Sequence, residues 1–312
     1  LNELTEVNIT AAGSEKIATL QKAGDAWVVA ERSAYPADVG NLRKQLLALS
    51  EARIIEKKTA NRDLYHRLGV QDISKSDAGG HEIRLVSPGM DQQVIIGNSG
   101  PQINSSRYVR LSNERSSWLI DRGISVDQPT ADWLQKDLFD ISSSRIAQIR
   151  IEGTDGSVVE LKNTDPKTSH FEAMSLLKDS DEFAEALIHQ VTNALDSFQL
   201  IDVMLASEFP ADAAQTSDAK YTTFDGIVLK ITTFMQDGQH YARIKCHFDE
   251  EMVDESALQA LSESGTEFTL DTAKALVMQV RAKTDNRVFM IPNVSHDALA
   301  QTYENMLVII DE

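Results

Sequence analysis

Histidine is the residue type in this sequence best suited to acid–base or metal chemistry near neutral pH. The seven histidines are His66, His81, His170, His189, His240, His247 and His296. They lie far apart along the chain, and none forms the His-x-His or His-Glu-x-x-His spacing of a metal site. We therefore predict no catalytic residue, no cofactor-binding or metal-binding residue, and no cofactor.

The single cysteine, Cys246, lies in a segment with the alternation of a strand. Even-numbered residues from Ala242 to Phe248 share one face of such a strand, and odd-numbered residues from Tyr241 to His247 share the other. Cys246 and His247 then point in opposite directions, which argues against a Cys–His nucleophile. One cysteine also excludes an intrachain disulfide framework and a multi-cysteine metal site.

Three other features match functional motifs only in part. Residues 97–101 are rich in glycine but lack the order of a phosphate-binding loop. The acidic segment 249–255 lacks the central glycine of a calcium-binding loop, so it predicts a helix N-terminus, where carboxylates meet the positive end of the dipole. Trp27, Trp118 and Trp133 lie in predicted regular elements, and we expect them in the core.

Composition and charge indicate a globular chain of about two domains. Of the 312 residues, 42% are hydrophobic, and 30 Lys and Arg stand against 48 Asp and Glu. The resulting charge of −18 disfavours nucleic acid as the main partner, because that binding depends on basic residues. Residues 1–142 carry a net charge of −2 and residues 143–312 a net charge of −16. We predict a first α+β half at 1–142 and a second, strongly acidic α+β half at 143–312.

Short strands followed by an amphipathic helix recur along the chain. In the first half, strands within residues 7–30 precede a helix in which Leu42, Leu46 and Leu49 recur at helical spacing, with Asp38 as N-cap. The pattern starts again in the second half. Its predicted elements are a hairpin at 146–161, a helix from Asp181, a linker at 210–219, a hairpin at 225–248, a strand at 287–292 and a closing helix at 297–306.

Sequential hairpins favour antiparallel sheets, because each parallel strand would need a crossover connection. We therefore predict an α+β fold of repeated antiparallel hairpin–helix units. Each half has a hairpin, a helix and then further strands, so we expect the two halves to be loosely duplicated.

Several short phrases occur in a distinctive order. They are GDAWVV (24–29), YPAD (35–38), YHRLGV (65–70), VIIG (94–97), RYVR (107–110), SWLIDR (117–122) and LFDI (138–141). Their order and spacing resemble the 4340 family of domains of unknown function, over roughly residues 7–200. The segment 288–292 is also similar to the closing part of such chains.

This resemblance implies an extracytoplasmic protein. Family members commonly have a single N-terminal membrane helix followed by an extracytoplasmic region, and some occur with ABC-transporter components, including those likened to gliding-motility auxiliary proteins. The family has no established catalytic residues, so none is carried over. The chain begins with Leu1 and not with Met, and we expect a leader or a membrane anchor to precede it in the full-length protein.

We therefore expect a non-enzymatic scaffold or protein-interaction module, accessory to an ABC-transporter assembly. It would be periplasmic or in the cell envelope and tethered to the inner membrane by an anchor that this chain lacks. Its expected partner is a protein, with transporter subunits as candidates, and not nucleic acid. One alternative is a glycan- or peptide-binding protein with a cleft between its halves. Another is a hydrolase whose carboxylates are distant in sequence.

Overall fold

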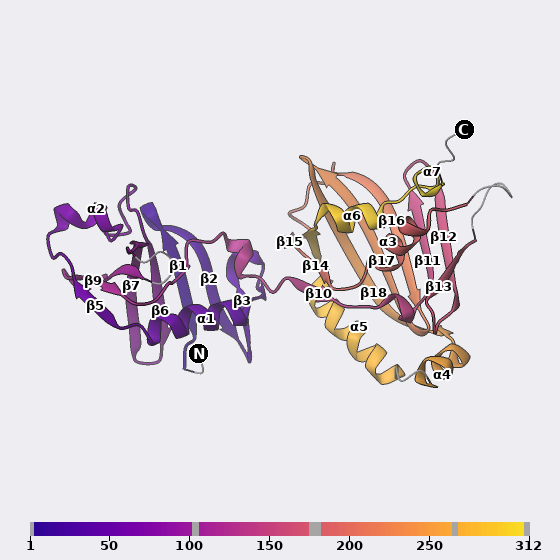
Figure 1. Ribbon diagram of the computed structural model, residues 1–312, viewed down its shortest axis with the longest axis horizontal. Coiled ribbons are helices and arrows are strands. Elements are labelled where there is room, and N and C mark those ends of the chain that lie inside the picture. Colours follow the sequence, from indigo (N-terminus) through magenta and orange to yellow (C-terminus); the bar gives the residue numbers. More distant parts are fainter. Residues whose placement is uncertain (1–2, 102–105, 175–181, 264–267, 309–312) are drawn as a thin grey trace. The chain divides into compact units, whose positions relative to one another are not determined.

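The chain folds into two compact units, Leu1–Gln135 and Lys136–Glu312. The computed structural model describes residues 3–101, 106–174, 182–263 and 268–308. Each unit is built on one large antiparallel sheet with helices, so the predicted α+β class is confirmed (Figure 1). The boundary predicted from charge, between residues 142 and 143, falls among the first residues of the second unit.

Unit 1 contains a nine-stranded sheet in the order β4-β3-β2-β1-β6-β7-β8-β9-β5. Its strands are β1 (Glu6–Ala11), β2 (Glu15–Ala23), β3 (Ala26–Val29), β4 (Tyr35–Pro36), β5 (Ile54–Lys57), β6 (His81–Ser87), β7 (Met90–Ser99), β8 (Arg107–Leu111) and β9 (Ser117–Ile120). Its helices are α1 (Val39–Ser50) and α2 (Tyr65–Leu68), with 3-10 turns η1 (Ala12–Ser14), η2 (Ala30–Arg32), η3 (Arg62–Leu64) and η4 (Thr130–Trp133).

The core of unit 1 follows from alternation along these strands. Val7 of β1 lies opposite Leu20 of β2 on one side and Leu85 of β6 on the other. Ile9, two residues further along β1, lies opposite Ile83 and is fully buried with it. One face of three neighbouring strands is therefore apolar, as the period of two requires.

Helix α1 begins where the sequence predicted. The carboxylate of Asp38 accepts a hydrogen bond from the backbone N–H of Asn41 at 2.9 Å, which satisfies one of the free donors of the first turn. Leu42 is completely buried, and the amide oxygen of buried Gln45 accepts a hydrogen bond from the N–H of Ser125 at 2.9 Å. These contacts hold α1 against the segment that follows β9.

Unit 2 contains an eight-stranded sheet in the order β13-β12-β11-β16-β17-β18-β19-β15, and β10 pairs with β14 separately. The strands are β10 (Asp137–Phe139), β11 (Ile146–Gly153), β12 (Val158–Asp165), β13 (His170–Ala173), β14 (Phe198–Gln199), β15 (Asp202–Leu205), β16 (Ala214–Thr223), β17 (Asp225–Gln236), β18 (Gln239–Val253) and β19 (Arg287–Met290). The helices are α3 (Glu185–Thr192), α4 (Glu255–Glu263), α5 (Leu270–Thr284), α6 (Asn293–Leu299) and α7 (Tyr303–Met306), preceded by the 3-10 turn η5 (Ser143–Arg145).

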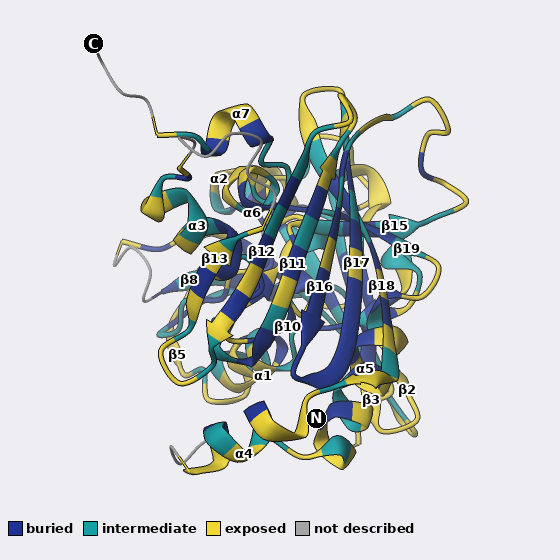
Figure 2. Cartoon of the chain, turned by 90° about the vertical axis from the view of Figure 1, so that its right-hand side faces the viewer, coloured by how far each residue is buried: buried dark blue, intermediate teal, exposed yellow. Residues whose placement is uncertain are grey.

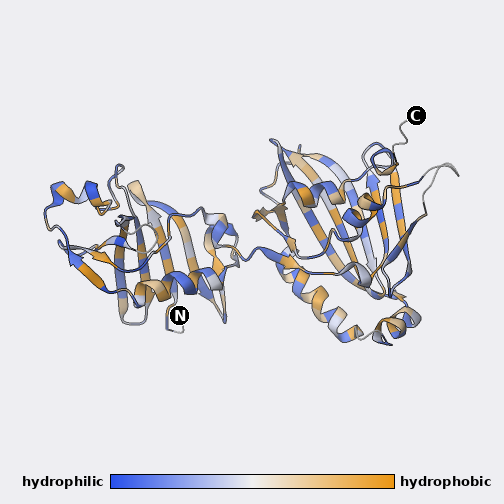
Figure 3. Ribbon diagram, viewed as in Figure 1, coloured by the Kyte–Doolittle hydropathy of each residue, from blue (hydrophilic) through white to orange (hydrophobic). Residues whose placement is uncertain are grey.

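The two faces of the unit 2 sheet differ in character. On the inner face, the Tyr221 hydroxyl donates to the carbonyl of Val191 in α3, and Lys274 of α5 lies over the ring of Phe248. Helix α6 contacts β16, β17 and β18. The outer face carries exposed charged residues such as Lys220. Buried and exposed residues alternate along several strands of this sheet (Figure 2), and so do hydrophobic and hydrophilic residues (Figure 3). Helices therefore cover one face of a two-layer unit.

The two sheets have corresponding strand orders. If β1, β2 and β3 are matched to β11, β12 and β13, and β5 through β9 to β15 through β19, the matched strands lie in the same order in both sheets. Strand β4, at the edge of the unit 1 sheet, has no counterpart in the unit 2 sheet. In both units a helix, α1 or α3, precedes the strand at the far edge, β5 or β15. Unit 2 differs by inserting α4 and α5 between β18 and β19, where unit 1 has a short connection between β8 and β9.

Several predicted elements of unit 2 are wrong in detail. Residues 214–219 of the predicted linker belong to β16, a central strand whose small polar residues are buried and hydrogen-bonded. The helix predicted from Asp181 is shorter, since α3 spans Glu185–Thr192, and Asp181 lies outside the described residues. The closing helix is two short helices, α6 and α7. In the acidic segment, β18 continues to Val253 before α4 begins at Glu255.

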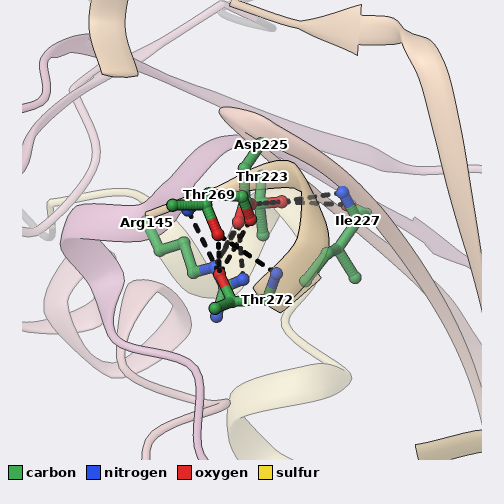
Figure 4. A network of polar contacts seen from close by, with 6 residues as sticks. All are labelled: Arg145, Thr223, Asp225, Ile227, Thr269 and Thr272. Carbon is green, nitrogen blue, oxygen red and sulfur yellow. Dashed lines mark hydrogen bonds and ion pairs between the residues drawn. The ribbon is translucent and has the colours of Figure 1, made fainter. Parts of the chain in front are cut away.

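A buried ion pair joins Arg145, the last residue of η5 before β11, to Asp225 at the turn between β16 and β17 (Figure 4). Arg145 Nη2 donates to Asp225 Oδ2 at 2.5 Å, and the Asp225 side chain is completely buried. Thr223 donates to the same carboxylate at 2.6 Å and accepts from the N–H of Ile227 at 2.9 Å. Gly226 has φ +83°, and a Cβ there would lie 2.6 Å from the carbonyl oxygen of Asp249, so the turn requires glycine.

Removal of one partner of this pair should destabilise unit 2 strongly. We expect Asp225→Ala to lower the free energy of unfolding by about 3–5 kcal/mol, because it leaves the Arg145 guanidinium buried without its counter-charge. Denaturant titration followed by far-UV circular dichroism measures this change. Lys167→Ala removes the exposed pair with Glu263 and serves as control, with an expected loss below about 1 kcal/mol. Equal losses in the two variants would contradict a stabilising role of the buried pair.

Candidate functional site

Among the described residues, one pair of histidine rings is in contact. His240 at the start of β18 and His296 of α6 stack with ring centroids 3.8 Å apart and planes at 25°. No local sequence pattern predicts this pair, because the two residues belong to separate elements that meet only in the folded unit.

His296 also belongs to a chain of polar side chains. Its Nε2 lies 3.1 Å from Thr216 Oγ1, and its Nδ1 lies 3.4 Å from a carboxylate oxygen of Asp297. Thr216 is in turn 2.6 Å from the hydroxyl of Thr233, which is 2.7 Å from that of Ser217. The order carboxylate–imidazole–hydroxyl is that of a nucleophilic triad.

The surroundings of His296 favour a structural role. The hydroxyl of Thr216 is held by Thr233, and Thr216 does not line the adjacent 400 Å³ hollow that His296 and Asp297 face. Burial lowers the pKa of His296, and neighbouring His240 lowers it further, so the imidazole is neutral at pH 7. Ser217 donates to the carbonyl of Leu299 at 2.8 Å. This network fastens α6 to the sheet.

A second polar hollow lies in unit 1, with a volume of about 180 Å³. Its lining includes His81 at the start of β6, Arg107 at the start of β8 and Asp127 after β9. Burial lowers the pKa of His81, Asp127 opposes that change, and Arg107 adds to it. The Arg107 guanidinium donates to the carbonyl of Gly97 at 3.4 Å, so part of its hydrogen-bonding capacity serves the fold.

Cys246 lies on the inner face with Ile244, as its alternation predicted, and only 6% of it is exposed. Burial raises the pKa of its thiol to about 12, so the nucleophilic thiolate is scarce at neutral pH. Within the described ranges, no three or more His, Cys, Asp or Glu side chains gather as a metal site would require.

Two tryptophans lie in the core as predicted, and one is half-buried. Trp133 is completely buried and Trp27 is 6% exposed, whereas Trp118 has intermediate exposure beneath the ammonium of Lys57 at 5.5 Å.

Asp196 bears on the hydrolase alternative, because the general acid of such an enzyme is a carboxyl group of raised pKa. Burial raises its pKa, and neighbouring Asp140 raises it further. Asp140 accepts a hydrogen bond from the N–H of Ser197 at 2.7 Å, which anchors the turn after α3.

An open groove with a largely apolar lining lies in unit 1 between α1, the segment before β1 and the β6–β7 hairpin. Its volume is about 710 Å³. The groove, called here the α1 groove, is lined by Glu3, Leu4, Arg43, Leu46, Leu47, Leu49, Ser50, Leu85, Ser87, Pro88, Gly89 and Met90. Leucine, proline and methionine side chains make up more than half of this lining, and the charged residues in it are Glu3 and Arg43.

The α1 groove exists because the helix is only partly covered. The spacing of its leucines predicted one buried face, and Leu42 is indeed completely buried. Leu46 and Leu49, one and two turns further along, have intermediate exposure and line the groove instead. Leu47 is 53% exposed and Met90 on the hairpin is 37% exposed. Exposed apolar residues in one concave patch are typical of binding surfaces.

Comparison with known families identifies a match. The sequence profile of a domain of unknown function, DUF4340, matches residues 27–225. The chain belongs to this family. No curated protein and no solved structure matches the chain.

The DUF4340 match runs from β3 of unit 1 to the start of β17 in unit 2, so it includes α1 and most of the groove lining. It confirms the family suggested by the ordered phrases of the sequence. None of the helices in the described part of the chain has both the length and the apolar character of a membrane span.

The lowered pKa of His81 makes the stability of unit 1 depend on pH. The ordinary pKa of histidine is 6.5, so below that pH His81 binds a proton in the unfolded chain but does so less readily in the folded unit. The free energy of unfolding therefore falls as the pH decreases from 7 to 5. All three tryptophans lie in unit 1, and their fluorescence in denaturant titrations measures this fall.

We expect His81→Gln to reduce the pH dependence of the tryptophan-detected transition. The control is His296→Gln, which removes the other histidine of lowered pKa but lies in unit 2. An unchanged slope in the His81→Gln variant would show that this histidine titrates alike in the folded and unfolded chains.

Proposed function

We propose that this chain is a non-enzymatic protein-interaction module whose α1 groove receives apolar side chains of a protein partner. The observation that carries the proposal is the groove itself, in which Leu46, Leu47 and Met90 present apolar surface to solvent. Burial of one leucine side chain stabilises a complex by about 1.5–3 kcal/mol. Several such contacts in one concave site are sufficient for a specific interface.

The proposed location is the periplasm or cell envelope, with the full-length protein tethered to the inner membrane. Membership of the DUF4340 family supports this location, through the N-terminal membrane helix that its members commonly have. The proposed partner is a subunit of an ABC-transporter assembly, because some members of the family occur with ABC-transporter components. In this arrangement the chain acts as an accessory scaffold.

We also propose that the two units are duplicated copies of one hairpin–helix design. The corresponding strand orders of the two sheets support this, together with the matching places of α1 and α3. The copies have diverged on their surfaces, because the exposed groove belongs to unit 1 and the insertion of α4 and α5 belongs to unit 2. A tandem of this kind offers two different binding surfaces.

The groove proposal predicts that Leu47→Asp weakens partner binding about tenfold or more, since a carboxylate would have to be desolvated in an apolar contact. A photo-crosslinking amino acid introduced at Leu47 in the full-length protein should also capture the partner from native membranes. Mass spectrometry of the crosslinked band then tests whether the partner is a transporter subunit.

Met278 provides the matched control. It is 66% exposed on α5 of unit 2, so Met278→Asp makes the same chemical change outside the groove. Equal recovery of the partner with the Leu47→Asp and Met278→Asp variants would contradict the proposal. Crosslinks of equal yield from the two positions would contradict it as well.

A further inference from the structure

Unit 2 contains a notch where part of one edge of β18 has no strand partner among the described residues. Strand β18 has 15 residues, but β19 pairs only with Tyr241 and Ala242 at its beginning. From Arg243 onward, β18 has β17 as its strand partner on one edge, and no described strand pairs with the other edge. In unit 1 the corresponding strands β8 and β9 pair over Arg107–Arg110, so the notch is specific to unit 2.

The hollow beside this free edge has a volume of about 820 Å³. It is bordered by five consecutive residues of β18, by the C-terminal turn of α5, by the two residues that follow β15 and by the start of β19. The lining of this β18 notch is Ala206, Ser207, Arg243, Ile244, Lys245, Cys246, His247, Arg281, Thr284, Asp285, Asn286 and Arg287. At about 3.3 Å per residue, the five strand residues provide an edge about 16 Å long.

The notch is basic within the acidic half of the chain. Four of the 13 basic residues between positions 143 and 312 line it, namely Arg243, Lys245, Arg281 and Arg287, against the single carboxylate of Asp285. Asp285 pairs with Arg281 at 3.4 Å. Neither Arg243 nor Lys245 forms an ion pair within the described residues, and Arg243 Nε is buried without a hydrogen-bond partner. A concave site with excess positive charge attracts a negatively charged ligand.

We infer that the β18 notch binds an extended acidic segment of a protein partner, which adds a strand to the free edge. Main-chain hydrogen bonds to an open edge supply affinity in this mode of recognition, and alternate side chains supply specificity. Arg243 and Lys245 point to the outer face and Ile244 and Cys246 to the inner face, where the charge of Arg281 is paired with Asp285. The segment therefore has acidic residues at every second position, with apolar residues between them.

The β18 notch lies in unit 2, whereas the α1 groove lies in unit 1. Binding at the notch therefore goes beyond the function proposed for the groove. The unpaired edge of β18 exposes backbone N–H and C=O groups, which proteins usually cover. A bound strand would cover these groups. Basic side chains along this edge disfavour pairing between two copies of the chain and favour an acidic partner.

A binding titration tests this inference. The probe is a fluorescein-labelled heptapeptide in which glutamate and valine alternate, with glutamate at both ends. We expect saturable binding to the wild-type chain by fluorescence anisotropy, weakened by added salt. A peptide of the same composition, with its four glutamates first and its three valines last, should bind much more weakly because it cannot match the alternation of β18.

Charge reversal at the notch provides the matched pair of variants. Lys245→Glu should weaken peptide binding about tenfold or more, because an attraction becomes a repulsion in a partly enclosed site. Lys220→Glu is the control, since Lys220 is also exposed on the outer face of this sheet but lies on β16, outside the notch. Both positions are exposed, so circular dichroism should show unchanged folding.

Hydrogen exchange distinguishes strand addition from simple charge attraction. Peptide binding should protect backbone amides within residues 243–247. The Leu47→Asp variant should bind the peptide as well as the wild-type chain does, because Leu47 lies in the α1 groove and not in the notch. The inference is overturned if the alternating peptide fails to bind, if the two peptides bind equally, if Lys220→Glu and Lys245→Glu have equal effects, or if no amide of that segment is protected.

Discussion

Each unit depends on one strand pairing between segments that are distant in the chain. In unit 1 the first strand, β1, pairs with β6, and in unit 2 β11 pairs with β16. These pairings unite an N-terminal hairpin group with a C-terminal one, and without them each sheet would separate into two smaller sheets with free edges. The entropy of closing the long intervening loops is offset by the apolar face that the joined strands bury.

Three clusters of buried polar groups fix places where elements of this structure meet. The Arg145–Asp225 pair holds the β16–β17 turn against the start of β11, and Arg110 of unit 1 donates to the carboxylate of Asp72 and the carbonyl of Val70. The hydroxyl and imidazole groups around His296 hold α6. Such groups tolerate burial only when their hydrogen bonds are satisfied.

The two binding surfaces arise where the regular pattern is incomplete. The α1 groove forms because α1 has more apolar surface than the sheet beneath it covers. The β18 notch forms because β19 is too short to pair with the whole of β18. A repeated fold can thus supply a rigid frame while local mismatches supply the binding sites.

The sequence by itself determined the α+β class, the family, the N-cap at Asp38 and the two faces of β18, because these depend on local spacing or on ordered phrases. It did not reveal β16, whose Thr216 and Ser217 resemble linker residues until a neighbouring strand and α6 satisfy their hydroxyls. Only the tertiary structure brought His240 onto His296, exposed Leu47 beside the β6–β7 hairpin and left one edge of β18 unpaired. Contacts of this kind depend on which distant segments meet, and no periodicity within a single segment encodes that.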